Sequence, residues 1–444
     1  MASSKRRSQP TKNQEPKTSK GNASPILNDG SRESIFALLK EGYRFIGNRA
    51  DRLGTDCFQT RLLGEPAICL RGEPAAKLFY NPTHFTRTAA APKRIRQTLF
   101  GAGGVQGLDG EAHAHRKALF MSCMDDAAVQ RLVGLFKEKW RSAAERWVNR
   151  RRIDLHRESQ KILYRAVVEW IGLPLIPSEV DRRSADMNAL VEGASSIGIQ
   201  YLRARRARQR NENWIIREIE DVRHYRATLS ADSIFAKFVF HRDIEGKLLP
   251  ERTLAVELLN LVRPTVAIAR YITFCAHALD EHPEAAAYIS NQPAHRESFV
   301  HEVRRFYPFF PFVAACVRDS FSWGGLLFPA GTRTLLDLYG TNRDRRIWTN
   351  PDQFDAARFE DAKIDPLQLI AQGGGDHFAG HRCAGEWVTI AIMNSAVEQL
   401  SQRMEYEVVQ KSRRLPLSRM PPMTSGGFNI RVKQVRSHRE LTRT

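Results

Sequence analysis

The sequence predicts a mainly α-helical protein with a small β region, folded as one large domain. Apolar residues recur at three-to-four spacing over most of the chain, which is typical of helices with one buried face. These helical segments are residues 127–149, 154–172, 210–229, 251–280, 294–306 and 384–403. No internal repeat and no linker rich in Gly, Pro or Ser divides the chain after residue 30. We therefore expect a single domain over residues 31–444.

Residues 1–30 are expected to form a disordered basic tail. They are rich in Ser, Lys, Pro and Asn and have no apolar core, so burial of apolar surface cannot offset the entropy lost on ordering. The tail holds only part of the formal net charge of +19, so the folded part is itself basic. This surplus of positive charge is compatible with an acidic partner.

The β region is expected near residues 60–72 and 332–340. Three short stretches in these regions combine β-branched and apolar residues and end in glycine: "TRLLG", "AICLRG" and "TRTLLDLYG". They are short, so we expect a small sheet beside the helices.

The run "RARRARQR" at residues 203–210 is the densest basic stretch of the expected helices. A solvated helix face explains most runs of this kind, while nucleic acid and an anionic membrane surface are the alternatives. The chain has no zinc finger, RNP motif or interleaved aromatic residues, so we expect no nucleic-acid partner.

The sequence favours a cytoplasmic protein without a transmembrane anchor. The longest apolar segment, residues 253–279, is broken by Glu257, Arg263, Pro264 and Arg270. Six cysteines are scattered along the chain without a CxxC pair, which favours a reducing compartment over a disulfide framework or a zinc knuckle.

Arg263 and Pro264 stand out within that apolar segment, which is apolar on nearly every side and so predicts a helix through the protein interior. Proline bends a helix, and a buried guanidinium needs a partner for its charge. No carboxylate lies three or four positions from Arg263. Two partners remain open: a distant Asp or Glu, or the carboxylate of a ligand, which arginine binds through two parallel hydrogen bonds.

The loop "GGGDHFAGHRCAGEW" at residues 373–387 surrounds Cys383 with glycines and opens into an apolar helix. A cysteine is usually a small buried apolar residue. Here the glycines allow a tight loop whose N–H groups face one sulfur, and the helix N-terminus favours an anion. The pattern therefore indicates a thiolate at Cys383.

This loop and the helix after it resemble the haem-ligand region of the cytochromes P450. The stretch "EVRR" at 302–305 supplies a Glu-x-x-Arg pair, and "DAARF" supplies Arg358. By resemblance, Glu302, Arg305 and Arg358 form a buried structural ion triad. The fold implied is the P450 fold, with the haem between a central distal helix and the proximal helix after the cysteine loop.

Two departures from the common P450 pattern point to one branch. The loop has Asp376, Ala379 and His381 where Phe, Gly and a basic residue are usual, and Arg263-Pro264 stands where the acid-threonine pair of the oxygen-activating helix is usual. Both departures resemble the fatty-acid peroxygenases. Further similar stretches are "LLKEGYRFIGNR" (38–49), "FYPFFPF" (306–312) and "LLDLYGTNRD" (335–344), so that the resemblance spans roughly residues 35–433.

The resemblance implies haem b bound through Cys383, with hydrogen peroxide as oxidant and no obligatory reductase. The implied substrate is a long-chain fatty acid, hydroxylated at the alpha or beta carbon. Its carboxylate would bind Arg263, next to Pro264, and act as the general acid–base group. Thiolate ligation would favour cleavage of the O–O bond.

Further site residues follow from the same resemblance. Gln106 takes a distal-pocket position where a decarboxylating member has His, which favours hydroxylation. The expected acyl-channel residues are Phe100, Val191 and Phe309, although ordinary core positions would look the same. The candidates for holding the haem propionates are Arg87, His113, Lys117 and Tyr307.

Several alternatives stay open at this stage. Within the same class they are a fatty-acid decarboxylase that forms terminal alkenes and a reductase-driven monooxygenase. A non-catalytic haem- or lipid-binding protein is the alternative from a different class. A dinucleotide-binding dehydrogenase is disfavoured, because "GAGGVQG" at 101–107 has Gln106 at the third glycine position of GxGxxG and no preceding strand pattern.

Overall fold

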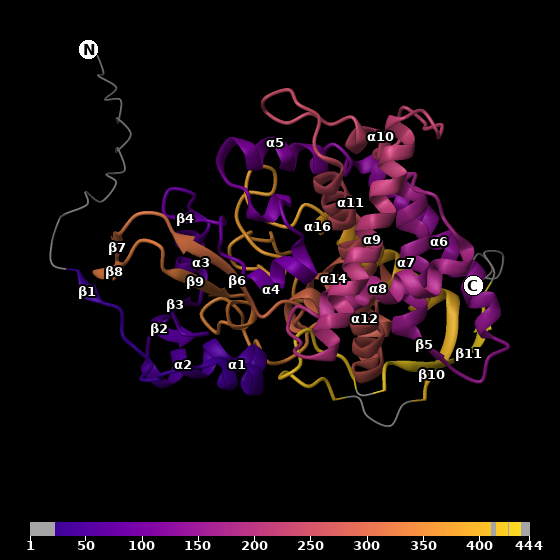
Figure 1. The fold of residues 1–444 in the computed structure, drawn as a ribbon. Helices are drawn as coiled ribbons and strands as arrows, with labels where there is room; N and C mark the ends of the chain where they lie inside the picture. The colour runs from indigo at the N-terminus through magenta and orange to yellow at the C-terminus, as the bar shows by residue number, and fades with distance from the viewer. Residues whose placement is uncertain (1–22, 410–413, 425, 437–444) are drawn as a thin grey trace, which may run out of the picture.

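A computed structural model describes residues 23–409, 414–424 and 426–436 of the chain. Figure 1 shows a helical part on the right and a part rich in strands on the left, with β1 (Ser24–Pro25) at its left edge. The largest apolar core lies within the helical part, and smaller clusters lie beneath the sheet. The structure thus confirms the expected mainly helical fold with a small β region.

The helical part is built from the following helices. They are α5 (Gly110–Met121), α6 (Asp126–Trp147), α7 (Leu155–Ile171), α8 (Val180–Glu192), α9 (Ile199–Arg223), α10 (Ile234–Val239), α11 (Glu251–Ala267), α12 (Ala269–Glu281), α13 (Pro283–Asn291), α14 (Pro293–Phe306) and α16 (Glu386–Glu398). The remaining helices are α1 (Ile35–Glu41), α2 (Phe45–Leu53), α3 (Glu73–Phe79), α4 (Lys93–Ile95) and α15 (Leu338–Thr341). Single 3₁₀ or π turns cover Gly42–Arg44, Arg96–Phe100, Val105–Gly107, Pro177–Glu179 and Gln399–Arg403.

The strands form three sheets. The largest has the order β2 (Cys57–Leu62), β3 (Glu65–Leu70), β9 (Arg333–Asp337), β6 (Phe312–Val317) and β4 (Phe85–Thr86). Its β3–β9 pair is parallel and its other pairs are antiparallel. The second sheet joins β1 (Ser24–Pro25), β8 (Leu326–Phe328) and β7 (Phe321–Trp323), and the third joins β10 (Met404–Val408), β11 (Asn429–Val435) and β5 (Ile153–Asp154). The two segments expected to form strands are β2–β3 and β9.

Some helix boundaries differ from the sequence prediction. The helix expected over 210–229 already begins at Ile199, so the basic run 203–210 belongs to α9. The pattern at 251–280 predicts one helix, but the structure interrupts it at Ile268, between α11 and α12. The apolar spacing also misses α5 and α8, because each helix buries polar residues, such as Arg116 in α5 and Asp186 in α8, on the side that faces the protein.

The last residues of the expected tail, 23–30, have a defined structure. Ser24–Pro25 pair with Leu326–Leu327, Ile26 is buried, and Asp29 accepts hydrogen bonds from Arg49 and Thr60. Residues 23–30 are therefore part of the folded domain, because two strand pairings and a buried carboxylate hold them. Residues 1–22 of the expected tail lie outside the described residues.

Helix α11 runs through the helical part and is packed against α7, α8 and α9. Nearly every residue from Leu254 to Val266 is buried, as the apolar pattern predicts. Pro264 lies inside the helix and has no N–H to donate, so the helix loses one hydrogen bond there. Over the described ranges, no helix has both the length and the apolar character needed to cross a bilayer.

The ion triad expected from the sequence is present. Glu302 is fully buried and receives both Nε and Nη2 of Arg305 at 2.7 Å, Nε of Arg358 at 3.0 Å, and the backbone N–H of Asp355 at 3.0 Å. The carboxylate of Glu302 thus holds α14 against the segment that contains Asp355 and Arg358. The carbonyls of Asn342 and Pro351 also accept hydrogen bonds from Arg305.

We expect Glu302→Ala to lower the free energy of unfolding by about 3–5 kcal/mol, because it leaves two guanidinium groups without their carboxylate. Denaturant unfolding followed by circular dichroism measures this change. The matched control is Glu407→Ala, which breaks a half-exposed pair with Arg431 and is expected to leave the free energy of unfolding nearly unchanged. Equal losses in the two variants would contradict a structural role for the triad.

Candidate active site

Cys383 lies just before α16, in the glycine loop. Its backbone N–H donates to the carbonyl of Gln372 at 3.3 Å, and its own carbonyl accepts from the N–H of Glu386 at 3.3 Å. The side-chain amide of Gln372 also donates to the sulfur at 3.9 Å. A side chain at position 374 would come within 2.5 Å of the carbonyl oxygen of Pro366, so Gly374 lets the loop pack this closely.

The surroundings of Cys383 favour a protonated thiol in the absence of a metal. Burial raises its pKa, and the charge of Glu386 acts in the same direction. A hydrogen bond from the backbone of Gly385 and the charges of Lys117 and Arg304 lower the pKa by less. Without a metal, the pKa of Cys383 therefore lies above that of a free thiol, and coordination to a metal ion favours the thiolate.

Arg87 and Lys117 lie near this loop as cations without a carboxylate partner. The Lys117 ammonium donates to the carbonyls of Gly380 and Arg382 at 3.0 and 2.6 Å, and Arg87 donates to the carbonyl of Ala314 at 3.0 Å. Among the described side chains, no Asp or Glu forms an ion pair with either, and burial lowers the pKa of both. A haem b carries two carboxylates, so two unpaired cations beside a single buried cysteine fit this cofactor.

His113 lies in the same cluster and stacks on His381, with ring centroids 3.9 Å apart. Burial and the charge of Lys117 lower the pKa of His113 to about 4, and burial and Arg87 lower that of His381 to about 3. Both rings are therefore neutral at pH 7 and offer hydrogen bonds rather than charge.

Arg263 lies in a chain of hydrogen bonds along one face of α11. Its Nη2 donates to Asn260 Oδ1 at 3.3 Å, and the amide of Asn260 donates to Glu257 at 3.1 Å and to Gln106 Oε1 at 3.2 Å. Arg116 from α5 completes the chain with a 2.8 Å contact to the other oxygen of Glu257. Asn260 is the branch point that links the two expected distal-pocket residues, Arg263 and Gln106.

Arg208 from α9 lies against the same region. Its Nε donates to Glu212 at 2.6 Å, while its Nη2 has no partner among the described residues. Gly101 has a φ of +87°, and a side chain there would overlap both Arg208 and Val256 of α11. The glycine thus lets the loop before Gln106 lie directly on α11.

The charges of this region do not balance. Three buried guanidinium groups, those of Arg116, Arg208 and Arg263, meet two carboxylates, and the ion pairs join Arg116 to Glu257 and Arg208 to Glu212. Arg263 has no ion pair with any described residue, and its Nε has no hydrogen bond. Of the two partners left open by the sequence, a distant Asp or Glu is therefore not found.

Burial and the charge of Arg208 lower the pKa of Arg263 to about 9, and Cys383 acts in the opposite direction. Arg263 is thus a cation at neutral pH, near enough to Cys383 for the two groups to interact electrostatically. The region between them is the candidate active site, with a cation on α11 and a sulfur at the start of α16.

The three expected channel residues come from different elements. Phe100 ends the π turn Arg96–Phe100, which packs against α8, the helix that carries Val191. The ring of Phe309 stacks on Tyr271 of α12 with centroids 5.2 Å apart. Their role in binding an acyl chain remains a proposal.

Tyr307 does not join the cluster of Arg87, His113 and Lys117. Its ring stacks on Phe274 at 5.3 Å, and its buried hydroxyl has no hydrogen-bond partner among the described residues. The placement does not support a role in holding a propionate. The residue lies at the C-cap of α14, where the change of backbone direction decides which way the ring points.

Sequence reasoning missed the roles of Asn260, Arg208 and Arg116. A signal for Asn260 is present, because Glu257, Asn260 and Arg263 follow one another at three-residue steps and so share a helix face. No comparable signal marks Arg208, which lies in a basic run typical of a solvated surface.

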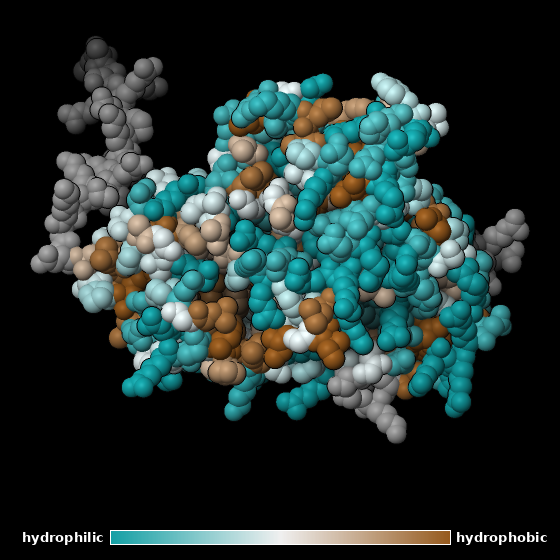
Figure 2. Space-filling model, in the orientation of Figure 1, coloured by the Kyte–Doolittle hydropathy of each residue, from teal (hydrophilic) through white to brown (hydrophobic). Residues whose placement is uncertain are grey.

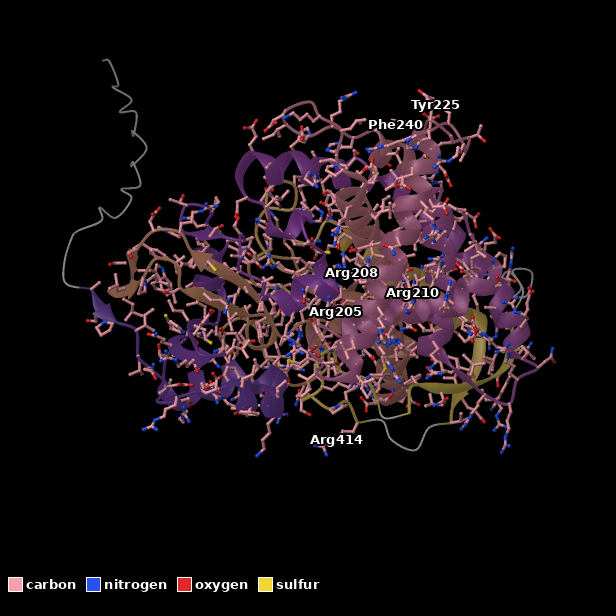
Figure 3. All side chains as sticks on the ribbon, in the orientation of Figure 1. Arg205, Arg208, Arg210, Tyr225, Phe240 and Arg414 are labelled. Carbon is pink, nitrogen blue, oxygen red and sulfur yellow. The ribbon has the colours of Figure 1, made fainter. Side chains whose placement is uncertain are left out.

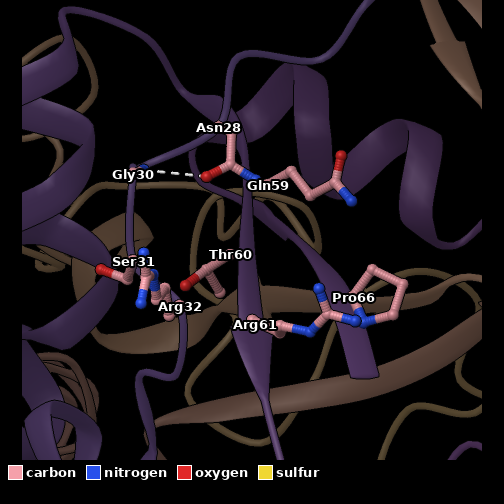
Figure 4. Close-up of a pocket in the computed structure, with 8 residues that line it drawn as sticks. All are labelled: Asn28, Gly30, Ser31, Arg32, Gln59, Thr60, Arg61 and Pro66. Carbon is pink, nitrogen blue, oxygen red and sulfur yellow. Dashed lines mark hydrogen bonds between the residues drawn. The ribbon is translucent and has the colours of Figure 1, made fainter. Parts of the chain in front are cut away.

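Two surface hollows lie elsewhere. A pocket of about 210 Å³, shown in Figure 4, is lined by residues from 28–32 and 59–61 and by Pro66. A groove of about 470 Å³ lies between α6, α14 and α16. Neither is lined by Arg263 or Cys383, and the pocket of Figure 4 has no acid, base or nucleophile suited to catalysis.

Comparison with known proteins identifies the family. The family model described as Cytochrome P450 matches residues 296–428, which include the triad glutamate and Cys383. The solved structure of cytochrome P450EX alpha (CYP152N1) with myristic acid is 43% identical, with a TM-score of 0.89, over 92% of this chain and 98% of that chain.

Two further solved structures agree. Cytochrome P450SP alpha (CYP152B1) in complex with (R)-ibuprophen is 42% identical, with a TM-score of 0.88, over 90% of this chain and 98% of that chain. Cytochrome P450 OleT, ligand-free, is 32% identical, with a TM-score of 0.90, over 93% of this chain and all of that chain. The chain therefore belongs to the cytochrome P450 family, and within that family to the CYP152 branch.

Proposed function

We propose that this protein is a peroxygenase that uses hydrogen peroxide to hydroxylate long-chain fatty acids at the alpha or beta carbon. One observation carries the proposal: Arg263 is a buried cation without a carboxylate, in a region where the other guanidinium groups are paired. A fatty acid supplies the missing negative charge. The solved relatives are in keeping with this, since both bound molecules, myristic acid and ibuprophen, are carboxylic acids.

As a cytochrome P450, the protein is an oxidoreductase with a haem held through a cysteine thiolate. Cys383 would supply the thiolate, Arg87 and Lys117 would pair with the two haem propionates, and His113 would add a hydrogen bond. The haem, when bound, supplies the redox chemistry that cleaves the O–O bond and oxidises a C–H bond.

Among the described residues, no carboxylate beside Arg263 is free. Glu257 already accepts from Arg116 and Asn260, one hydrogen bond on each oxygen, and Glu212 accepts from Arg208. A proton must move between the two peroxide oxygens before they separate, and this needs an acid–base group within hydrogen-bond reach. The carboxylate of the substrate, held on Arg263, takes this role.

Fixing the carboxylate also decides which carbon reacts. Two parallel hydrogen bonds from the guanidinium hold the acid group in one orientation, so the first carbons of the chain lie next to the oxidant. Gln106 is a neutral amide whose oxygen already accepts from Asn260. It is not a proton donor of the imidazolium type, which supports hydroxylation over formation of a terminal alkene.

The direct test is product analysis. Haem-loaded protein is incubated with hydrogen peroxide and palmitate, without NAD(P)H or a reductase, and the products are separated by gas chromatography. We expect 2- or 3-hydroxypalmitate. A requirement for NAD(P)H and a reductase would identify a conventional monooxygenase, a terminal alkene as main product would identify a decarboxylase, and no product under either condition would indicate a binding protein.

Asn260 is expected to position Arg263 without touching the substrate chain. In Asn260→Leu the link from Arg263 to Glu257 and Gln106 is lost, so we expect KM for palmitate to rise by about tenfold or more while the haem spectrum is unchanged. Asn260→Gln, which keeps the amide, should recover part of the loss. If Asn260→Leu leaves KM unchanged, or if Asn260→Gln behaves like Asn260→Leu, the positioning role is wrong.

A further inference from the structure

The basic run of α9 lies on a surface that the proposed function does not use. Together with the segment from α4 to Phe100, the start of α9 exposes six cations: Lys93, Arg94, Arg96, Arg203, Arg205 and Arg206. Between them, Ile197, Ile199 and Leu202 are 68%, 70% and 48% exposed. We call these nine residues the basic tip. Arg205 is labelled in Figure 3, and Figure 2 shows that the molecular face formed by α8 and α9 is largely hydrophilic.

The two segments of the basic tip form one continuous surface. Arg94 donates to the carbonyl of Ser196 at 2.7 Å, and its guanidinium lies 4.7 Å from the centre of the Tyr201 ring. The hydroxyl of Tyr201 in turn donates to Gln97 at 2.7 Å. These contacts hold the cations and the exposed apolar side chains in a fixed arrangement.

The charge of the basic tip is not compensated. Residues 91–104 and 193–210 contain no Asp or Glu. Among the described residues, none of the six cations forms an ion pair, whereas Arg208 and Arg210, on other sides of the same helix, pair with Glu212 and Asp186. An unpaired cluster of this size attracts an anionic surface.

We propose that the basic tip docks on an anionic lipid bilayer. Exposed aliphatic side chains gain free energy by entering the boundary between headgroups and acyl chains, and the surrounding cations meet the anionic headgroups. The phosphates of a nucleic acid would also pair with the cations. Its bases, however, stack on aromatic rings rather than on aliphatic chains, so Ile197, Ile199 and Leu202 would remain in water.

The surface is also placed to receive the proposed substrate. The first of these segments ends at the half-buried Phe100, and α8, which carries Val191, ends just before the second. A fatty acid held in a bilayer would therefore meet the protein beside its expected acyl channel. This delivery step rests on the proposed function, whereas bilayer binding itself does not.

Sedimentation of the haem-loaded full chain with vesicles tests the docking. We expect the protein to bind vesicles of phosphatidylcholine and phosphatidylglycerol at 4:1, to bind pure phosphatidylcholine weakly, and to lose binding in high salt. The combined change Arg203→Glu, Arg205→Glu and Arg206→Glu should weaken binding by about 100-fold or more. Ile197→Ser with Ile199→Ser should weaken it by about tenfold and keep the salt dependence.

The matched control reverses the charge of another exposed basic run and changes the net charge by the same amount. It combines Arg150→Glu, Arg151→Glu and Arg152→Glu. This variant should bind almost as well as the unmodified protein. Equal losses in the two charge variants would show attraction without a defined surface and overturn the proposal. So would binding of duplex DNA, but not vesicles, that depends on Arg203, Arg205 and Arg206.

Delivery is tested separately by the turnover of palmitate presented in vesicles or free in solution. The Arg203, Arg205 and Arg206 variant should lose turnover only for the vesicle-bound acid. If the unmodified protein binds vesicles but oxidises neither form, the proposed function fails and the docking surface stands. If it oxidises both forms but does not bind vesicles, the docking surface is wrong.

Discussion

Arg263→Leu is expected to lower the turnover of palmitate by about 10³-fold or more while the haem stays bound. Two effects combine, because the substrate loses its orientation and its carboxylate is no longer held where it can move the proton. The protein itself should not be destabilised, since leucine removes a buried cation that has no carboxylate partner. Initial rates, the carbonyl-adduct spectrum and denaturant unfolding measure the three expectations.

Arg263→Lys is the matched control for this change. Lysine keeps the positive charge but offers a single ammonium in place of two parallel hydrogen bonds, so we expect intermediate turnover and a broader distribution of products. A crystal soaked with palmitate should show the carboxylate on Arg263. Full turnover in Arg263→Leu, or a head group bound far from Arg263, would refute the carboxylate anchor.

Cys383→Ala is expected to remove the thiolate signature from the carbonyl-adduct spectrum and to abolish turnover. Cys383 is the cysteine that α16 and Gln372 hold in place at the start of a helix. Cys316→Ala is the control, because this half-buried cysteine lies on β6 in the sheet. A thiolate signature that survives in Cys383→Ala and disappears in Cys316→Ala would move the ligand to another part of the fold.

The sequence predicts best those features that depend on spacing along the chain. Cys383 is marked by its glycines, whereas Glu302 and Arg305 are identified through the resemblance to the cytochromes P450, because a Glu-x-x-Arg pair alone is a weak signal. Arg263 is marked by its charge within an apolar run. The absence of an acidic partner, however, becomes visible only when the helices around α11 are in place.

Features that arise from packing between distant segments were not predictable. Arg208 lies in a run that looks solvated, yet it is buried because α9 packs on α11 and the Gly101 loop covers it. Tyr307 was expected near the haem, but its ring turns toward α12. The pairing of Ser24–Pro25 with β8 is too short to leave a pattern in the sequence.

The burial of Cys383 couples cofactor uptake to the acidity of the medium. Its environment favours the thiol when no metal is present, whereas the iron of a haem binds the thiolate, so each haem that enters displaces one proton into solution. Below the pKa of the thiol, the apparent association constant for haem should therefore rise with pH. Assembly of the holoprotein would then be weakest in acid.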